Sequence, residues 1–389
     1  MTGPAQDPAV VIARSENGQA LDVFIQAAPS STRDDQRTQF VSMVDASLHA
    51  LRSQGLAPSS VVSGWLRFAT APSWDWREAL ATAWQVSGVL PITALVQPPA
   101  QPFCACSLGL HAIRAAMQSG VWLAPSASPA VATVLRGGSR HVRLMSVTPR
   151  PELCKTGSFA DLTYDMFAQA GHALTARGLS FADVVRTWIH VRDIEKNYAS
   201  LNQARTRYFR EQRLSRLPAS TCVEGRPVGV DVPVTMDVYA VPANQDVRVE
   251  AMSPGTMGEA SGYGSSFARA VQLGEPGRRW LFVSGTASID TKGKVFAVGD
   301  VQGQLECMFG HVRALLAQAG MGLGDALTAT AYLKRADYLP EFTKTARAHG
   351  LAPSIPCAVA VADICRPEWL CEIELCAVRK DDQPEAGSS

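Results

Sequence analysis

The sequence has almost no excess charge of either sign. Its 36 lysines and arginines nearly balance 35 aspartates and glutamates, which leaves a formal net charge of +1 at pH 7. Nucleic acids and anionic membranes are attracted by an extended field of positive charge, and this chain has none. We therefore expect neither as a partner. A small molecule is the expected partner, and an anion-binding site must be a local cluster of arginines.

Leader peptides, membrane spans and metal motifs are also missing. The opening segment MTGPAQDPAVVIARSENG has neither a basic region nor an apolar core, and no apolar run approaches the ~20 residues of a membrane helix. The nine cysteines are an odd number without C-x-x-C spacing, so we expect reduced thiols and a cytoplasmic protein. The seven histidines form no i, i+4 pair and no cluster with cysteines, so no metal and no cofactor is expected.

One pattern, in contrast, is present three times. A helix, a glycine that ends it and an apolar strand follow one another around Gly55, Gly178 and Gly320. The copies lie roughly 120–140 residues apart, which is the size of a small α/β unit and too long for a solenoid repeat. The 47% of hydrophobic residues can fill several cores. The sequence therefore predicts three related units.

The third copy shows the order of elements most clearly. Alternating apolar residues predict a strand over 278–289, and Asp300 is the expected N-cap of a helix that ends before Gly320. A strand over 328–334 and a second helix that Gly350 ends come next, and two further strands complete the copy. Two strands before the first helix, one between the helices and two after them predict an α+β fold, in which a mixed sheet carries both helices on one face.

Such a sheet leaves its other face bare and apolar, and three bare faces can close around one another. We therefore expect a single-chain pseudo-trimer, monomeric in solution, with clefts between neighbouring units. The predicted division is a degenerate first unit over 1–150, a second unit over 151–245, a third over 246–380 and a disordered tail over 381–389.

Several segments resemble the RidA family of reactive-imine deaminases, among them LFVSGTAS at 281–288 and LCEIEL at 370–375. The resemblance is strong over 262–379 and moderate over 155–242. RidA proteins are homotrimers with sites between subunits. Three copies in one chain are similar to the chorismatases, and ICRPEWLCEIE at 364–374 is a chorismatase-like segment.

The resemblance to chorismatases implies a lyase that splits chorismate into pyruvate and 3-hydroxybenzoate and needs no cofactor. A cyclohexadiene diol and 4-hydroxybenzoate are the alternative products. The imine deaminases have an arginine fifteen positions before the site glutamate, where this chain has Cys357. Imine hydrolysis by the usual arrangement needs that arginine. A RidA-type imine deaminase is the first alternative because of the overall resemblance, and a non-catalytic protein that binds a small aromatic acid is the second.

Cleavage of an enol ether begins when a proton is added to the terminal methylene carbon, so the site must hold an acid that is protonated near neutral pH. Glu372 is the candidate. Strand alternation puts Glu372, Glu374 and Cys376 on one face. We align Glu372 with Asp237 in the second unit and Gly109 in the first, which predicts one active site per chain. An unperturbed glutamate has a pKa of ~4.3, so burial must raise the pKa of this one.

Cys365 lies seven positions before the acid, and the resemblance implies that it favours formation of hydroxybenzoate. The alternative is that this thiol is inert packing. The substrate carboxylates require guanidinium and hydroxyl donors, which are dense on the predicted helix over 198–212, where Arg205 and Tyr208 are i, i+3 neighbours, and on the loop after it. The predicted substrate-binding residues are Tyr208, Arg216, Ser220, Thr221, Arg269, Gly285, Thr286 and Arg366.

Overall fold

The computed structural model describes residues 10–17, 20–115, 129–136, 138–253, 255–258 and 264–381. In this part of the chain the strands form three sheets, of six, five and six strands. The expected disordered tail lies outside the described residues from 382 onwards. No helix among the described residues is long and apolar enough to cross a membrane.

The first sheet has the strand order β1-β2-β5-β3-β4-β10. Its strands are β1 (Val10–Glu16), β2 (Ala20–Ala27), β3 (Val61–Phe68), β4 (Ile92–Val96), β5 (Cys106–Ala115) and β10 (Arg226–Pro227). Its helices are α1 (Gln36–Ser53) and α2 (Trp76–Trp84). β3 and β4 are parallel and the other pairs are antiparallel, so the sheet is mixed.

The second sheet has the order β6-β7-β11-β8-β9. Its strands are β6 (Ala130–Arg136), β7 (Ser139–Val147), β8 (Val184–Val191), β9 (Ala219–Glu224) and β11 (Val234–Ala240), and its helices are α3 (Phe159–Thr175) and α4 (Ile194–Glu211). The predicted boundary at residue 150 assigns β6 and β7 to the first unit. The strand pairing places them in the second sheet, because β7 is hydrogen-bonded to β11.

The third sheet has the order β12-β13-β14-β17-β15-β16. Its strands are β12 (Arg248–Met252), β13 (Ala270–Glu275), β14 (Arg278–Ala287), β15 (Ala326–Leu333), β16 (Cys357–Val361) and β17 (Cys371–Lys380). Its helices are α5 (Val301–Gln318) and α6 (Leu339–His349). The predicted order of two strands, helix, strand, helix and two strands is confirmed in this unit, with β12 added at the edge.

The same local signals start and stop the first helix of each unit. Asp35, Ser158 and Asp300 are the N-caps, and each side chain accepts a hydrogen bond from a backbone N–H of the first turn. Gly55, Gly178 and Gly320 follow with φ of 67°, 71° and 69°, a left-handed conformation that glycine adopts without strain. A 3₁₀ turn then leads into β3, β8 and β15, the strands between the two helices of each unit, which we call the middle strands. The three turns are Pro58–Ser60, Phe181–Asp183 and Leu323–Asp325.

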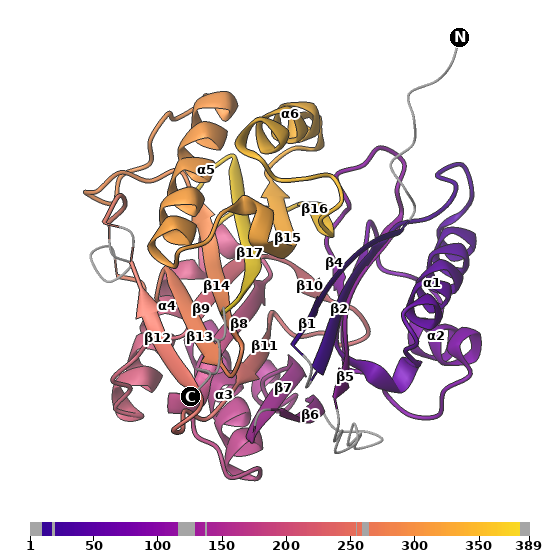
Figure 1. The fold of residues 1–389 in the computed structure, drawn as a ribbon, viewed down its shortest axis with the longest axis horizontal. Helices are drawn as coiled ribbons and strands as arrows, with labels where there is room; N and C mark the ends of the chain where they lie inside the picture. The colour runs from indigo at the N-terminus through magenta and orange to yellow at the C-terminus, as the bar shows by residue number, and fades with distance from the viewer. Residues whose placement is uncertain are drawn as a thin grey trace, which may run out of the picture.

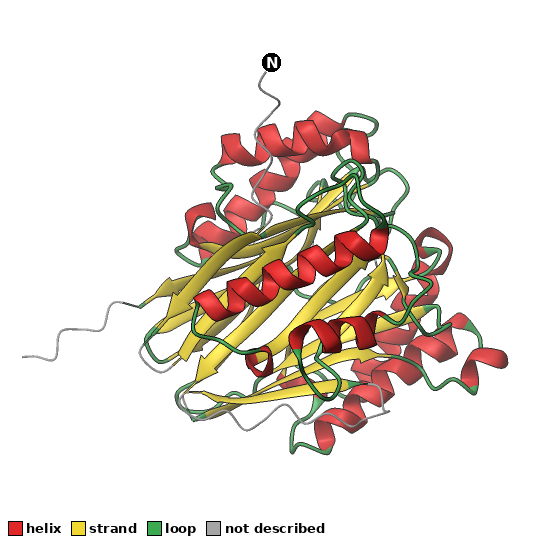
Figure 2. Ribbon diagram, turned by 90° about the vertical axis from the view of Figure 1, so that its right-hand side faces the viewer, coloured by secondary structure: helices red, strands yellow, loops and turns green. Residues whose placement is uncertain are grey.

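The three sheets turn their strands towards the centre of the molecule and carry their helices outside (Figures 1 and 2). Each unit has its own helix-side core, exemplified by Phe40, Phe167 and Phe309. A further cluster joins the inner faces of the three sheets and contains Phe24, Val185, Tyr239 and Phe282. The predicted α+β pseudo-trimer is therefore confirmed as the architecture.

The strand registers align the three units position by position. β3, β8 and β15 each have eight residues and begin directly after the 3₁₀ turn. The residues opposite their fifth position are Gly109, Asp237 and Glu374. The residues opposite their seventh position are Ser107, Thr235 and Glu372. The predicted alignment of Glu372 with Asp237 and Gly109 is thus wrong by two residues, although Glu372 is still the one acid at its position.

Candidate active site

Glu372 lies on β17 of the third unit and points towards the second unit. A cavity of about 410 Å³, its opening included, lies beside it. The lining residues come from α4 and β9 of the second unit and from the third unit: Tyr198, Arg205, Ser220, Cys222, Phe267, Arg269, Gly285, Ala287, Ile289, Cys365, Trp369 and Glu372. The acid is only 4% exposed. The structure thus places a buried carboxyl at the seam between two units, as the sequence predicted.

Gly285 makes room for this carboxyl. A Cβ atom built on Gly285 would lie 2.0 Å from Glu372 Oε1 and 2.9 Å from Glu372 Cδ, both closer than real Cβ contacts come. The third neighbour of that position is the methyl carbon of Thr221, at 3.2 Å. The backbone and the carboxyl therefore approach one another in a way that only glycine permits.

The pKa of Glu372 is raised to about 8, chiefly by burial and then by the nearby charge of Glu374, while Arg186 and Arg269 act in the opposite direction. Among the described residues, no hydrogen bond to the Glu372 carboxyl is found that would favour its ionised form. With a pKa of about 8, about nine in ten molecules carry the proton at pH 7. The group can therefore act as a general acid at neutral pH.

Glu374, two residues along the same strand face, has the opposite environment. It is paired with Arg186 and accepts a hydrogen bond from Thr221 Oγ1. Trp188 Nε1 donates to Glu374 Oε1 at 3.1 Å, and the Tyr332 hydroxyl donates to it at 3.3 Å. These donors surround the Glu374 carboxylate, whose negative charge raises the pKa of Glu372.

Two arginines flank one wall of the cavity. The guanidinium carbons of Arg205 and Arg269 lie 5.5 and 5.4 Å from the ring centre of Phe267. Arg205 Nη2 donates to Asn202 Oδ1 at 2.5 Å, while its buried Nε has no hydrogen-bond partner among the described residues. Arg269 Nε donates to the carbonyl oxygen of Gly258 at 3.1 Å. A carboxylate ligand in the cavity would satisfy the Arg205 donor.

Cys365 lies at the outer end of the cavity with Tyr198. Burial and the neighbouring Glu372 raise the pKa of the Cys365 thiol well above its ordinary value. The Tyr198 hydroxyl lies 3.0 Å from Ser265 Oγ, and burial raises its pKa as well. Both groups therefore stay protonated near neutral pH and can donate or relay a proton without being anionic nucleophiles.

The structure brings together five of the predicted site residues around the cavity, namely Ser220, Arg269, Gly285, Cys365 and Glu372. Arg366 lines the wider cleft that continues outwards past Tyr198 and Cys365. Thr221 stands behind the cavity, where its Oγ1 accepts from the Gly285 N–H at 2.9 Å. Thr286 instead donates to the Ser284 carbonyl oxygen at 2.8 Å and does not line the cavity.

Tyr208 and Arg216 do not reach the cavity. Tyr208 is 4% exposed and packs against Phe167 and Phe181 in the helix-side core of the second unit. Arg216 donates to the backbone carbonyl oxygens of Ala182 and Val184, at 2.9 and 3.0 Å. These two predicted positions are corrected, because one side chain belongs to the apolar face of α4 and the other ties a loop to β8.

Helix spacing could have identified the residues that were missed. Tyr198 and Arg205 are seven positions apart on α4, which is close to two turns, and Asn202 lies between them on the same face. Tyr208 lies three positions after Arg205 and already faces the core. The polar stripe over 198–205, and not the arginine-rich end of the helix, marks the cavity side. Phe267 and Trp369 carry no such signal.

The register also shows which position replaces the deaminase arginine at this cavity. Cys357 pairs with Ala329 and Ser220 pairs with Thr187, the fourth residues of β15 and β8. Ser220 is therefore the counterpart of Cys357 in the second unit, and Ser220 is the one beside Glu372. Cys357 lines a different cleft, between the third unit and the first. In the Glu372 cavity the hydroxyl of Ser220 therefore stands where the deaminases have an arginine, and the guanidinium groups come from Arg205 and Arg269.

Comparison with known proteins agrees with this repeated architecture. A family model described as endoribonuclease L-PSP matches residues 146–242 and 265–379, which make up more than half of the chain. The chain belongs to this family. The two matched segments correspond to the second and third units, so this endoribonuclease L-PSP family protein contains at least two RidA-like domains.

Two relatives are RutC family proteins. The one from Pasteurella multocida is 31% identical over 96 residues, which cover 23% of this chain and 71% of that protein. The one from Haemophilus influenzae is 32% identical over 84 residues, which cover 20% of this chain and 64% of the relative. Each relative thus corresponds to a single unit of this family member.

A crystal structure of a chorismatase matches almost the whole chain. Its TM-score is 0.62 at 20% sequence identity, and the match covers 82% of this chain and 93% of the chorismatase. That coverage extends well beyond the two segments of the family model. The protein therefore has a chorismatase fold built from RidA-like units.

Proposed function

We propose that the protein is a chorismatase, a lyase that converts chorismate to 3-hydroxybenzoate and pyruvate. The observation that carries the proposal is the buried carboxyl of Glu372, whose pKa of about 8 keeps it protonated at neutral pH beside two arginines. A substrate with two carboxylates and an acid-labile enol ether fits such a cavity. The chorismatase fold supports the same assignment.

In this mechanism Glu372 gives its proton to the terminal methylene carbon of the enolpyruvyl group. The resulting oxocarbenium ion is stabilised by the carboxylate that Glu372 has become. Water adds to the cation and returns a proton to Glu372, which gives a hemiketal. The bond between the former enol carbon and the ether oxygen then breaks, so pyruvate leaves and the ether oxygen stays on the ring as a hydroxyl group. Loss of water from the ring then gives the hydroxybenzoate, so no water is consumed overall.

The remaining cavity residues have roles that follow from their positions. Arg205 and Arg269 bind a substrate carboxylate and hold the enol ether against the acid. Phe267 and Trp369 cover the apolar face of the ring, and Cys365 assists the proton transfer that accompanies aromatisation. A general acid contributes ~10²–10⁴-fold, so most of the remaining acceleration comes from orientation and electrostatic stabilisation.

The test is incubation of the purified protein with chorismate, with the aromatic acids separated by chromatography and pyruvate measured in parallel. The proposal requires equal amounts of pyruvate and hydroxybenzoate; 4-hydroxybenzoate or a diol would correct only the product. The absence of pyruvate would refute the proposal. Ammonia release from 2-aminoacrylate would then favour the imine deaminase, and tight binding of an aromatic acid without turnover would favour a binding protein.

A further inference from the structure

A second cavity lies where the inner faces of the three sheets meet. About 780 Å³ of space lies between its protein atoms, the opening included. The third and fifth residues of the three middle strands all line it: Ser63 and Trp65, Arg186 and Trp188, and Thr328 and Thr330. Equivalent positions of all three units face it, so this central cavity lies on the pseudo-threefold axis.

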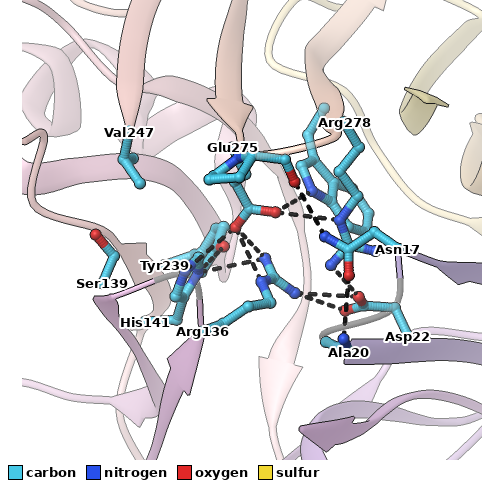
Figure 3. Close-up of polar contacts among 12 residues, drawn as sticks. Asn17, Ala20, Asp22, Arg136, Ser139, His141, Tyr239, Val247, Glu275 and Arg278 are labelled. Atoms are coloured by element: carbon cyan, nitrogen blue, oxygen red, sulfur yellow. Dashed lines mark hydrogen bonds and ion pairs between the residues drawn. The ribbon is translucent and has the colours of Figure 1, made fainter. Parts of the chain in front are cut away.

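A network of buried ion pairs closes one end of the central cavity (Figure 3). Arg136 bridges Asp22 and Glu275, with N···O distances of 3.0 and 2.6 Å. Arg278 joins the same two acids at 2.6 and 3.2 Å. His141 Nδ1 lies 2.7 Å from the Tyr239 hydroxyl at the edge of this network. The charges of this end are thus largely paired with one another.

The charges around the whole cavity do not balance. Five buried arginines and four buried acidic side chains line it or contact its lining: Arg67, Arg136, Arg143, Arg186 and Arg278, and Asp22, Asp237, Glu275 and Glu374. His111 adds no charge at pH 7, because burial and Arg143 lower its pKa to about 4. One positive charge therefore remains without a counterpart in a place that water reaches poorly.

Two of the arginines have no acidic partner among the described residues. Arg67 donates to Gln97 Oε1 at 2.9 Å, and Arg143 lies 4.1 Å above the ring centre of Tyr239. In addition, Nη1 of Arg186, whose side chain lines the cavity, is buried and has no hydrogen-bond partner within the part of the chain that the structure describes. Buried guanidinium groups are costly unless they are paired, so these donors indicate an anionic ligand.

Aromatic rings form much of the remaining wall. The rings of Trp65 and Trp188 lie 5.0 Å apart, and Phe24, Trp280 and Phe282 contribute further faces. Such walls suit a flat, apolar ring, which would pack against them while its acidic group met the guanidinium donors. The central cavity adjoins the cleft between the first and third units, because Gln26 and Ala358 line both spaces.

We propose that the central cavity is a second ligand site that binds a planar aromatic monocarboxylate, with Arg143 and Arg186 holding its carboxylate. The single negative charge of such a ligand would balance the one buried positive charge that has no counterpart among the described residues. The site is separate from the Glu372 cavity, and the inference does not depend on the proposed function. If the enzyme produces hydroxybenzoate, its own product belongs to the class that this site accepts.

The test is isothermal titration calorimetry of the full-length protein with benzoate, combined with quenching of tryptophan fluorescence, because Trp65 and Trp188 line the site. Arg143→Gln should weaken benzoate binding at least tenfold, and Arg143→Lys should weaken it less because it keeps the charge. Arg347→Gln in the neighbouring cleft is the matched control and should leave binding unchanged. If Arg143→Gln does not fold, Arg67→Gln serves as the second variant and should also weaken binding.

Benzoate could also enter the Glu372 cavity, and Arg205→Gln separates the two sites. The proposal expects benzoate binding to persist in Arg205→Gln and to be lost in Arg143→Gln or Arg67→Gln. Loss in Arg205→Gln alone, or no detectable binding to the wild-type protein, would overturn it. Turnover of chorismate is measured separately, so failure of this proposal and failure of the proposed function are distinguishable.

Discussion

Replacement of Glu372 by glutamine should make the protein more stable and much less active, and the gain in stability should depend on pH. In the folded protein burial holds the pKa of this carboxyl at about 8, against an ordinary value of 4.5. Between these two values the folded state keeps a proton that the unfolded chain loses. Stability of the wild type therefore falls as pH rises through this window.

The size of the effect follows from the shift. A rise in pKa from 4.5 to about 8 corresponds to at most about 5 kcal/mol of unfolding free energy, because each pKa unit is worth about 1.4 kcal/mol. Glutamine does not titrate. The difference in unfolding free energy between Glu372→Gln and the wild type should therefore be small at pH 5, increase steadily up to pH 8 and then remain constant.

Urea unfolding at pH 5, 7 and 9 measures this difference in unfolding free energy. Turnover of chorismate by the same variant should fall about 10²–10⁴-fold at pH 7, because the general acid is lost. The matched control is Glu341→Gln, which removes an exposed glutamate on α6 and should change neither quantity. A stability difference that does not vary with pH would refute the argument that the buried acid is protonated. Full activity in Glu372→Gln would refute its role as proton donor.

Three further substitutions test the geometry of the cavity. Gly285→Ala should lower kcat at least about 100-fold, because its Cβ would displace the acid. The control Gly274→Ala should leave kcat unchanged, because its Cβ would meet nothing closer than 3.9 Å. Equal kcat values in the two variants would contradict the role of Gly285. Arg205→Gln should raise KM for chorismate about 10–100-fold, whereas Arg313→Gln, at an exposed position, should leave KM unchanged. An unchanged KM in Arg205→Gln would show that Arg205 does not bind the substrate. Tyr208→Phe should leave kcat and KM unchanged and alter the free energy of unfolding by less than about 1 kcal/mol, because Tyr208 packs in the helix-side core. A change in kcat or KM would show that Tyr208 does contribute to the site.

Local signals in the sequence were sufficient for the architecture. The cap at Asp300 and the left-handed glycine at residue 320 define one helix, and strand alternation separates Glu372 from the apolar residues that face the helices. These features depend on neighbours within a few residues, so they can be recognised without any knowledge of the fold. The choice of Glu372 as the buried acid, in contrast, followed from the resemblance to chorismatases.

The residues that complete the site depend on the packing of one unit against another. Arg205 and Tyr208 are close in sequence, yet one faces the third unit and the other faces its own core. Both are compatible with the same helix, and only the direction in which α4 docks distinguishes them. The two-residue error at Asp237 has a similar origin, because β17 has two acidic residues on one face, Glu372 and Glu374, and a sequence match cannot choose between them.

Three homologous clefts encoded by one gene can diverge separately, which the clefts of a homotrimer cannot do. A substitution in an identical subunit is repeated at every interface, whereas here the position of the acid is occupied by serine in one unit, threonine in another and glutamate in the third. Covalent linkage also fixes the effective concentration of the two walls of the Glu372 cavity, so specific activity should remain constant on extreme dilution.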